Sequence, residues 1–266
     1  MDKVEFVAFA FASPGYIATQ TVDHVAVAAA GHNWNCFGRG VDAKDGRQIA
    51  SGMGNAEWAA LIYGKQNEAC GGDQPAAGVI EKYEGVCHTA ANRILVLLGD
   101  DIDSRKALCN ELATLMYGKF GFHTDTYIET VKATAAQINA QTPGAIPQAE
   151  IDAVVTRITR GMAPDQELLL LKADVEEQFQ VHFDAFTDQQ KSDFVAAYTE
   201  FQTNRKADFD AEPRDGNGEF RARLANRMKP HLLKCLNSFV QILGPEQYTK
   251  VFHLMPPEAA KFLLGV

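Results

Sequence analysis

The chain has 266 residues, of which 46% are hydrophobic and 22% are charged, which is typical of a globular protein and excludes a disordered or fibrous one. Its formal net charge of -9 disfavours binding to phosphate backbones, so we expect no nucleic acid among its partners. No apolar stretch reaches the roughly 20 residues that cross a bilayer, so we expect no membrane span and a cytoplasmic location, with a leader removed before Met1 as the alternative.

The N-terminal part of the chain predicts a small antiparallel sheet. Residues 4–13 and 20–30 are apolar and partly alternating, and turn residues bound them, which indicates two strands. Residues 33–38 predict a third strand or a turn that leads into one. The glycines between residues 38 and 54 then predict a stretch rich in loops.

Helical signals begin at Asn55, which is a favoured N-cap for a helix that continues to Ile62. A short strand is expected at 79–83. Apolar residues then recur at helical spacing over 87–98, which predicts a buried helix closed by Gly99, and a further helix is expected at 103–117.

Beyond residue 124 strand signals vanish and helical patterns take over. Thr187 with Gln190 forms a capping box, and Pro245 is a favoured first helical residue. The expected helices cover 125–140, 147–160, 164–183, 188–207, 219–243, 245–254 and 257–264.

These patterns predict an α+β fold, in which a small antiparallel sheet packs against a helix that carries a cysteine at its N-terminus and an all-helical portion follows. We expect a domain boundary at residue 125, with an α+β domain over 1–125 and a helical domain over 126–266. The amphipathic, charged helices of the second domain are typical of a lid, a partner-binding module or an arm that forms a homo-oligomer.

The sequence Gly85-Val86-Cys87-His88 places a cysteine at the start of the predicted helix at 87–98. A helix N-terminus stabilises a thiolate, the nucleophilic form, and backbone N–H groups there form part of an oxyanion hole. The alternative is a structural, inert thiol. An odd number of cysteines does not indicate a disulfide scaffold, so we expect thiols in a reducing compartment at Cys36, Cys70, Cys87, Cys109 and Cys235.

A cysteine nucleophile needs a base, for which neutral imidazole is the usual group. His88 is a poor direct partner because adjacent side chains on a helix diverge by about 100°. His24, which starts an apolar strand segment, and His32, in the loop after it, are the two candidates, and each has a purely structural role as its alternative.

The strand Asp23-His24-Val25-Ala26-Val27, followed later by Cys87 at a helix start, resembles the circularly permuted branch of the papain-like fold. That branch includes permuted NlpC/P60 enzymes and lecithin retinol acyltransferase-like proteins. The resemblance covers residues 20–98 and implies that Cys87 is the nucleophile and His24 the base. It also implies a peptide, amide or acyl substrate whose acyl group is transferred through a thioester. The third residue that orients the histidine stays open among Gln20, His32, Asn33 and Asn35.

The segment 31–39 is rich in residue types that serve in binding sites, and it predicts either a substrate-binding or oxyanion loop or a hairpin whose aromatic side chains close the core. As substrate-binding residues we expect Trp34, Asn35, Cys36 and Arg39.

We expect no cofactor and no metal. No glycine-rich phosphate loop is present. A zinc site drawn from His32, Cys36, Cys70, Cys87 and His88 lacks the usual paired-ligand spacing. The leading hypothesis is a cysteine hydrolase or acyltransferase that acts on an amide or ester carbonyl, and the alternative is a non-enzymatic helical interaction or scaffold protein with a degenerate N-terminal domain.

Overall fold

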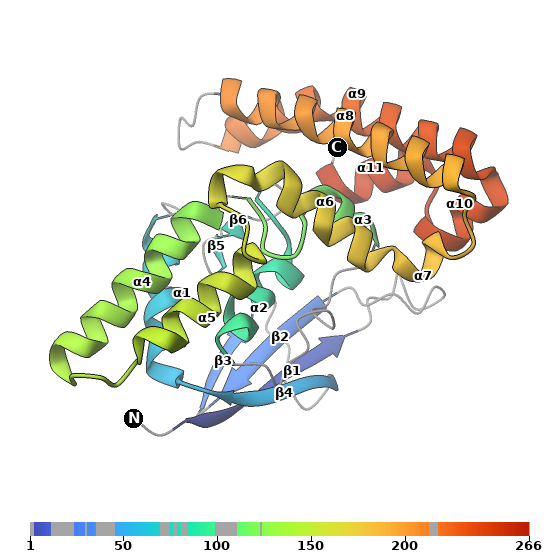
Figure 1. Cartoon of the computed structure of the whole chain (residues 1–266). Coiled ribbons are helices and arrows are strands. Elements are labelled where there is room, and N and C mark those ends of the chain that lie inside the picture. The colour runs from blue at the N-terminus through green and yellow to red at the C-terminus, as the bar shows by residue number, and fades with distance from the viewer. Residues whose placement is uncertain are drawn as a thin grey trace. The chain divides into compact units, whose positions relative to one another are not determined.

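A computed structural model of the chain describes ten stretches of it: residues 3–11, 24–29, 31–35, 46–69, 75–76, 79–80, 84–98, 111–122, 124–212 and 218–265. The predicted α+β class is confirmed. The strands lie in the N-terminal part, and every element from α2 onwards in these stretches is helical (Figure 1).

Four strands form one antiparallel sheet in the order β3-β2-β1-β4. The strands are β1 (Val4–Phe11), β2 (His24–Ala29), β3 (His32–Asn35) and β4 (Arg47–Gly54). Phe6 pairs with Ala29 and Ala8 with Val27, and because paired residues share a face, these four buried side chains form the inner face of the sheet.

The loop-rich prediction is wrong for residues 47–54, which form β4 along the free side of β1. The segment is rich in small residues and lacks clear alternation, so only its pairing with β1 identifies it as a strand. Gly54 suits this position, because a Cβ there would lie 2.3 Å from the Leu98 side chain. A two-stranded ribbon, β5 (Pro75–Ala76) with β6 (Val79–Ile80), confirms the start of the strand expected at 79–83.

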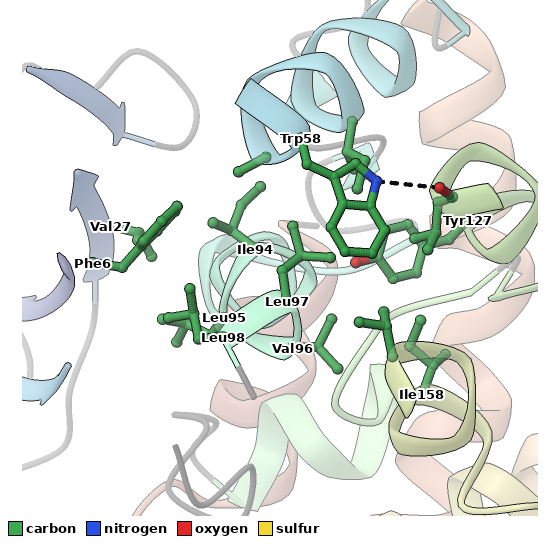
Figure 2. Close-up of a cluster of buried hydrophobic side chains, with 14 of the residues drawn as sticks. Phe6, Val27, Trp58, Ile94, Leu95, Val96, Leu97, Leu98, Tyr127 and Ile158 are labelled. Carbon is green, nitrogen blue, oxygen red and sulfur yellow. Dashed lines mark hydrogen bonds between the residues drawn. The ribbon is translucent and has the colours of Figure 1, made fainter. Parts of the chain in front are cut away.

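The inner face of the sheet packs against α2 (Cys87–Leu95) and η4 (Val96–Leu98), whose twelve residues are all buried. Figure 2 shows side chains of this segment with Phe6 and Val27 of the sheet on one side and Trp58, Tyr127 and Ile158 on the other. A helix that is covered all round lies in the core. The helix that begins at Cys87 is therefore a central, buried helix, and its packing against the sheet agrees with the predicted fold.

Three further helices complete the covering of α2: α1 (Ala56–Ala69), α4 (Thr124–Gln141) and α5 (Gln148–Thr159). The predicted cap of α1 is confirmed, since the Trp58 amide donates to Asn55 Oδ1 over 3.0 Å. The Trp58 indole donates to the Val131 carbonyl at 3.2 Å and the Thr134 hydroxyl at 3.1 Å, which fixes α1 on α4.

The chain divides into two compact units. Unit 1 holds Met1–Asn110 and Lys119–Leu170, and unit 2 holds Glu111–Gly118 and Leu171–Val266. The sheet therefore shares its unit with α4 and α5. Compactness alone does not test which parts fold independently, so the domain boundary at residue 125 stays a prediction.

All the regular secondary structure described in unit 2 is helical. Its longest helices pack side by side, and an aromatic cluster fills its core, where Phe194 stacks on Phe239 at 4.0 Å between ring centroids. The predicted capping box of Thr187 with Gln190 is confirmed, and so is Pro245 as the first residue of its helix. The remaining helices within the described stretches are α3 (Glu111–Tyr117), η6 (Pro164–Gln166), α6 (Glu167–Gln178), α7 (Gln180–Phe183), α8 (Asp188–Ala211), α9 (Gly218–Leu243), α10 (Pro245–Phe252) and α11 (Pro256–Leu264).

Candidate functional site

The predicted helix start at Cys87 is confirmed. Val86, in extended conformation, is the N-cap, and Cys87 is the first helical residue. The Thr89 hydroxyl accepts from the Val86 amide at 2.6 Å and donates to the Val86 carbonyl at 2.5 Å, so this one side chain fixes the backbone just before Cys87. A valine side chain cannot cap a helix, so the first-turn N–H groups next to Cys87 receive no side-chain cap from Val86.

The middle of α2 is held by polar side chains that reach across to the turn at 119–122. Asn92 donates to the Lys119 carbonyl at 2.8 Å. Arg93 donates from Nε to the Phe120 carbonyl and from Nη2 to the Phe122 carbonyl, both at 2.7 Å. These buried bonds set the position of α2 and therefore that of Cys87.

The same turn is fixed to the chain just before Cys87. The Phe122 amide donates to the Glu84 carbonyl at 2.9 Å. Gly121 approaches that carbonyl so closely that a Cβ would lie 2.3 Å from its oxygen. Both sides of the Gly85-Val86 junction are thus anchored, the upstream side by this turn and the downstream side by Thr89.

The direction of α2 along the sheet follows from two observations. Near its N-terminus, His88 interacts electrostatically with His24, the first residue of β2. At the other end, Leu98 approaches Gly54 beside Phe6, and Phe6 pairs with Ala29, the last residue of β2. Since β2 also packs against α2, the two run in the same direction, with His24 at the Cys87 end.

His24 and His32 therefore lie at opposite ends of β2. His32 pairs with Ala29 across the β2–β3 ladder, five residues from His24. At about 3.3 Å per residue, this separates the two backbones by roughly 17 Å along the strand. Strand alternation assigns His24 to the opposite face of the sheet from Val25.

His88 is a buried histidine with a strongly lowered pKa. It is 2% exposed, and neither ring nitrogen has a hydrogen-bond partner there. Burial, and next the charge of His24, lower the pKa of His88 from 6.5 to about 3. His88 is therefore neutral at pH 7 and too weakly basic to take a proton from a thiol.

Cys87 itself is 8% exposed, and His24 is 5% exposed. The thiol of Cys235 differs from Cys87 in setting, because it lies in the middle of α9 and not at a helix start. As expected for a core cysteine, Cys235 is buried, and burial followed by the charge of Glu200 raises its pKa well above the usual range.

The predicted substrate-binding segment is described only in part. Trp34 and Asn35 belong to β3, which confirms a strand within the segment expected over 33–38. The loop position expected for His32 is wrong, because His32 pairs with Ala29 and is the first residue of β3. The other two predicted substrate-binding residues, Cys36 and Arg39, lie outside the described stretches. The cysteines Cys70 and Cys109 lie outside them as well.

The positioning residues Asn92 and Arg93 were missed in the sequence interpretation. Both interrupt the apolar pattern of 90–98, and a charged residue inside an otherwise buried helix usually has fixed partners. That interruption was the available signal. The partners themselves lie about thirty positions downstream, at 119–122, where nothing in the sequence marks them.

No group of three or more His, Cys, Asp or Glu side chains within the described stretches has the geometry to hold a metal ion. Across those same stretches, no helix combines the length and apolarity needed to cross a bilayer. Comparisons with protein-family models, curated proteins and solved structures found no match to this chain.

Proposed function

We propose that this protein is a thiol hydrolase or acyltransferase in which Cys87 attacks an amide or ester carbonyl and His24 is the general base. The observation that carries the proposal is the packing of β2 on α2, with His24 at the end where Cys87 begins the helix. His32, the alternative base, has less support because its backbone lies at the far end of β2.

In this mechanism His24 accepts the proton of the Cys87 thiol, and the N-terminus of α2 stabilises the thiolate. The sulfur attacks the carbonyl carbon, and the carbonyl electron pair moves onto oxygen. When the tetrahedral intermediate collapses, the leaving group takes the proton from His24 and a thioester remains on Cys87. Water or a second acceptor then attacks the thioester and releases the thiol.

The resemblance to permuted papain-like enzymes supports the same two residues in the same roles. Within the proposal, the segment that begins in β3 binds the peptide, amide or acyl substrate through Trp34, Asn35, Cys36 and Arg39.

A cytoplasmic location and a homo-oligomer formed through the C-terminal helices also belong to the proposal, and sedimentation of the purified chain tests the oligomer.

The test is the rate at which iodoacetamide alkylates each cysteine of the native protein at pH 7, followed by peptide mass spectrometry. We expect Cys87 to react at least about tenfold faster than Cys235, because Cys87 lies at a helix N-terminus and Cys235 lies inside a helix. His24→Gln should slow the labelling of Cys87 and leave that of Cys235 unchanged.

The second candidate, a non-enzymatic scaffold, is favoured by one observation, the low exposure of Cys87. It predicts equally slow labelling of Cys87 and Cys235 in the native protein and no effect of His24→Gln. That result would reject the thiol-enzyme proposal.

A further inference from the structure

His88, at the start of α2, has two ring nitrogens that form no hydrogen bond with any described residue. A neutral imidazole carries one N–H donor and one acceptor nitrogen. Both are unpartnered although the side chain is 98% buried, whereas buried polar groups in native proteins nearly always have a partner. A molecule that brought a hydrogen-bonding oxygen to this point would remove that cost.

The neighbouring groups define what kind of oxygen this would be. His88 follows Cys87 directly in the first turn of α2, where Val86 supplies no side-chain cap. The N–H groups and the dipole of a helix N-terminus favour an oxygen that carries negative charge. A carbonyl under attack by the Cys87 sulfur develops such an oxygen, about one bond beyond the carbon that the sulfur reaches.

We infer that the imidazole of His88 donates a hydrogen bond to the oxygen of the carbonyl that Cys87 attacks, so that His88 is a catalytic residue for oxyanion stabilisation. The inference rests on the proposed thioester function. The divergence of adjacent side chains on a helix, which prevents His88 from taking the thiol proton, does not prevent it from reaching the carbonyl oxygen.

The charge state of His88 suits a donor. Because His88 stays neutral at pH 7, its N–H is present in every molecule, and donation to an oxyanion does not compete with release of a proton. Burial excludes water from this hydrogen bond, and donors that are already in place in a site without water contribute most to stabilising an oxyanion. His24, which exchanges a proton with Cys87, and His88, which donates without exchanging one, thus have separate roles.

The experiment compares two reactions of the same thiol in the full chain. Iodoacetamide alkylates Cys87 without forming an oxyanion, whereas 4-nitrophenyl acetate acetylates it through one. We expect His88→Leu to slow acetylation of Cys87 by about 100-fold and alkylation by no more than about twofold. His88→Gln, whose amide restores an N–H donor, should recover much of the acetylation rate. Cys87→Ala gives the background.

Each outcome decides the inference. Acetylation of His88→Leu at the wild-type rate, or an equal fall in acetylation and alkylation, would overturn the role of His88 and leave the thiol-enzyme proposal standing. Wild-type Cys87 that is neither acetylated nor alkylated faster than Cys235 would overturn both. If His88→Leu does not fold, His88→Met, which also lacks an N–H donor, takes its place, and the ratio of its acetylation rate to its alkylation rate decides, because a purely structural role leaves that ratio at its wild-type value.

Discussion

The buried imidazole of His88 links protonation to stability at the scale of a single residue. Its pKa is about 3 in the folded protein and 6.5 without burial, so the unfolded chain takes up the proton more readily. The contribution of the neutral His88 imidazole to the free energy of unfolding is fully present above pH 6.5 and is lost as the pH falls towards 3. We expect a loss of roughly 1.4 kcal/mol per pH unit in the free energy of unfolding across this interval.

Urea unfolding of the wild type and of His88→Leu at pH 7, 6, 5 and 4 measures this contribution. The variant should lose less stability on acidification. The slope of its free energy of unfolding against pH should be smaller than that of the wild type by the effect of about one proton, roughly 1.4 kcal/mol per pH unit. The matched control is His253→Asn, since His253 is an exposed histidine and asparagine tolerates its left-handed backbone. Equal pH dependence in the wild type and His88→Leu would contradict the assignment.

Arg93 is the second residue whose burial has a measurable consequence. Replacement by Met removes the guanidinium that pairs with the Phe120 and Phe122 carbonyls and lies 4.9 Å from the centre of the Tyr127 ring. We expect a loss of about 3 kcal/mol in urea unfolding, because two buried acceptors lose their charged donor. Arg47→Met, at an exposed arginine of the same unit, should cost less than about 0.5 kcal/mol.

The candidate site could be predicted from the sequence only where its determinants are local. Cys87 at a helix start follows from the apolar spacing after it and from Gly85 before it. The choice between His24 and His32 depends on the direction of α2 along β2, which is a property of the packing. The burial of His88 and its lack of partners are likewise set by elements far away in sequence, so no local pattern announces them.

At the scale of elements, the turn at 119–122 is held by close backbone approach, and Gly121 is the residue that permits it. Gly121 and Gly144 both have positive φ, +73° and +78°, but a Cβ at Gly144 would meet nothing within 4 Å. Gly144→Ala should therefore cost only the backbone term of about 1 kcal/mol. Gly121→Ala adds a clash with the Glu84 carbonyl and should cost at least about 3 kcal/mol.

Chemical denaturation of the two alanine variants provides the comparison, because the shared φ penalty cancels between them. Equal losses of stability would mean that the backbone at Glu84 accommodates the added Cβ of residue 121 without any further loss of stability. In that case the turn would not fix the chain in front of Cys87, and Thr89 alone would set its backbone.

Helices were predicted more accurately than strands for a physical reason. The caps Asn55 and Thr187 and the first helical residue Pro245 act on their own first turn, so a few neighbouring residues specify where each helix starts. β4 depends instead on pairing with β1, more than forty positions earlier in the chain, and its small residues give no periodic pattern. The sequence therefore marked the helix boundaries and missed this edge strand.

At the scale of the whole molecule, unit 2 includes a helix that comes from the middle of unit 1's sequence. α3 packs against α10 and α11, and the Tyr117 hydroxyl donates to the Leu263 carbonyl at 3.1 Å. The Gln202 side chain of α8 donates to the Leu115 carbonyl at 2.7 Å. The helices after residue 171 thus bury an apolar surface and two polar groups against a segment that precedes the predicted boundary at residue 125.

This arrangement makes a fragment of residues 126–266 a decisive test of the predicted boundary. Without α3, the fragment exposes the side chains that cover Leu115, Met116 and Tyr117, each of which is fully buried in the whole chain. We expect a fragment that keeps helical circular dichroism but unfolds without a sharp transition in urea and binds a hydrophobic dye. Residues 111–266 should unfold more cooperatively, because α3 is restored. A sharp transition of equal midpoint in both fragments would show that α3 is dispensable and would support a helical domain that begins at residue 126.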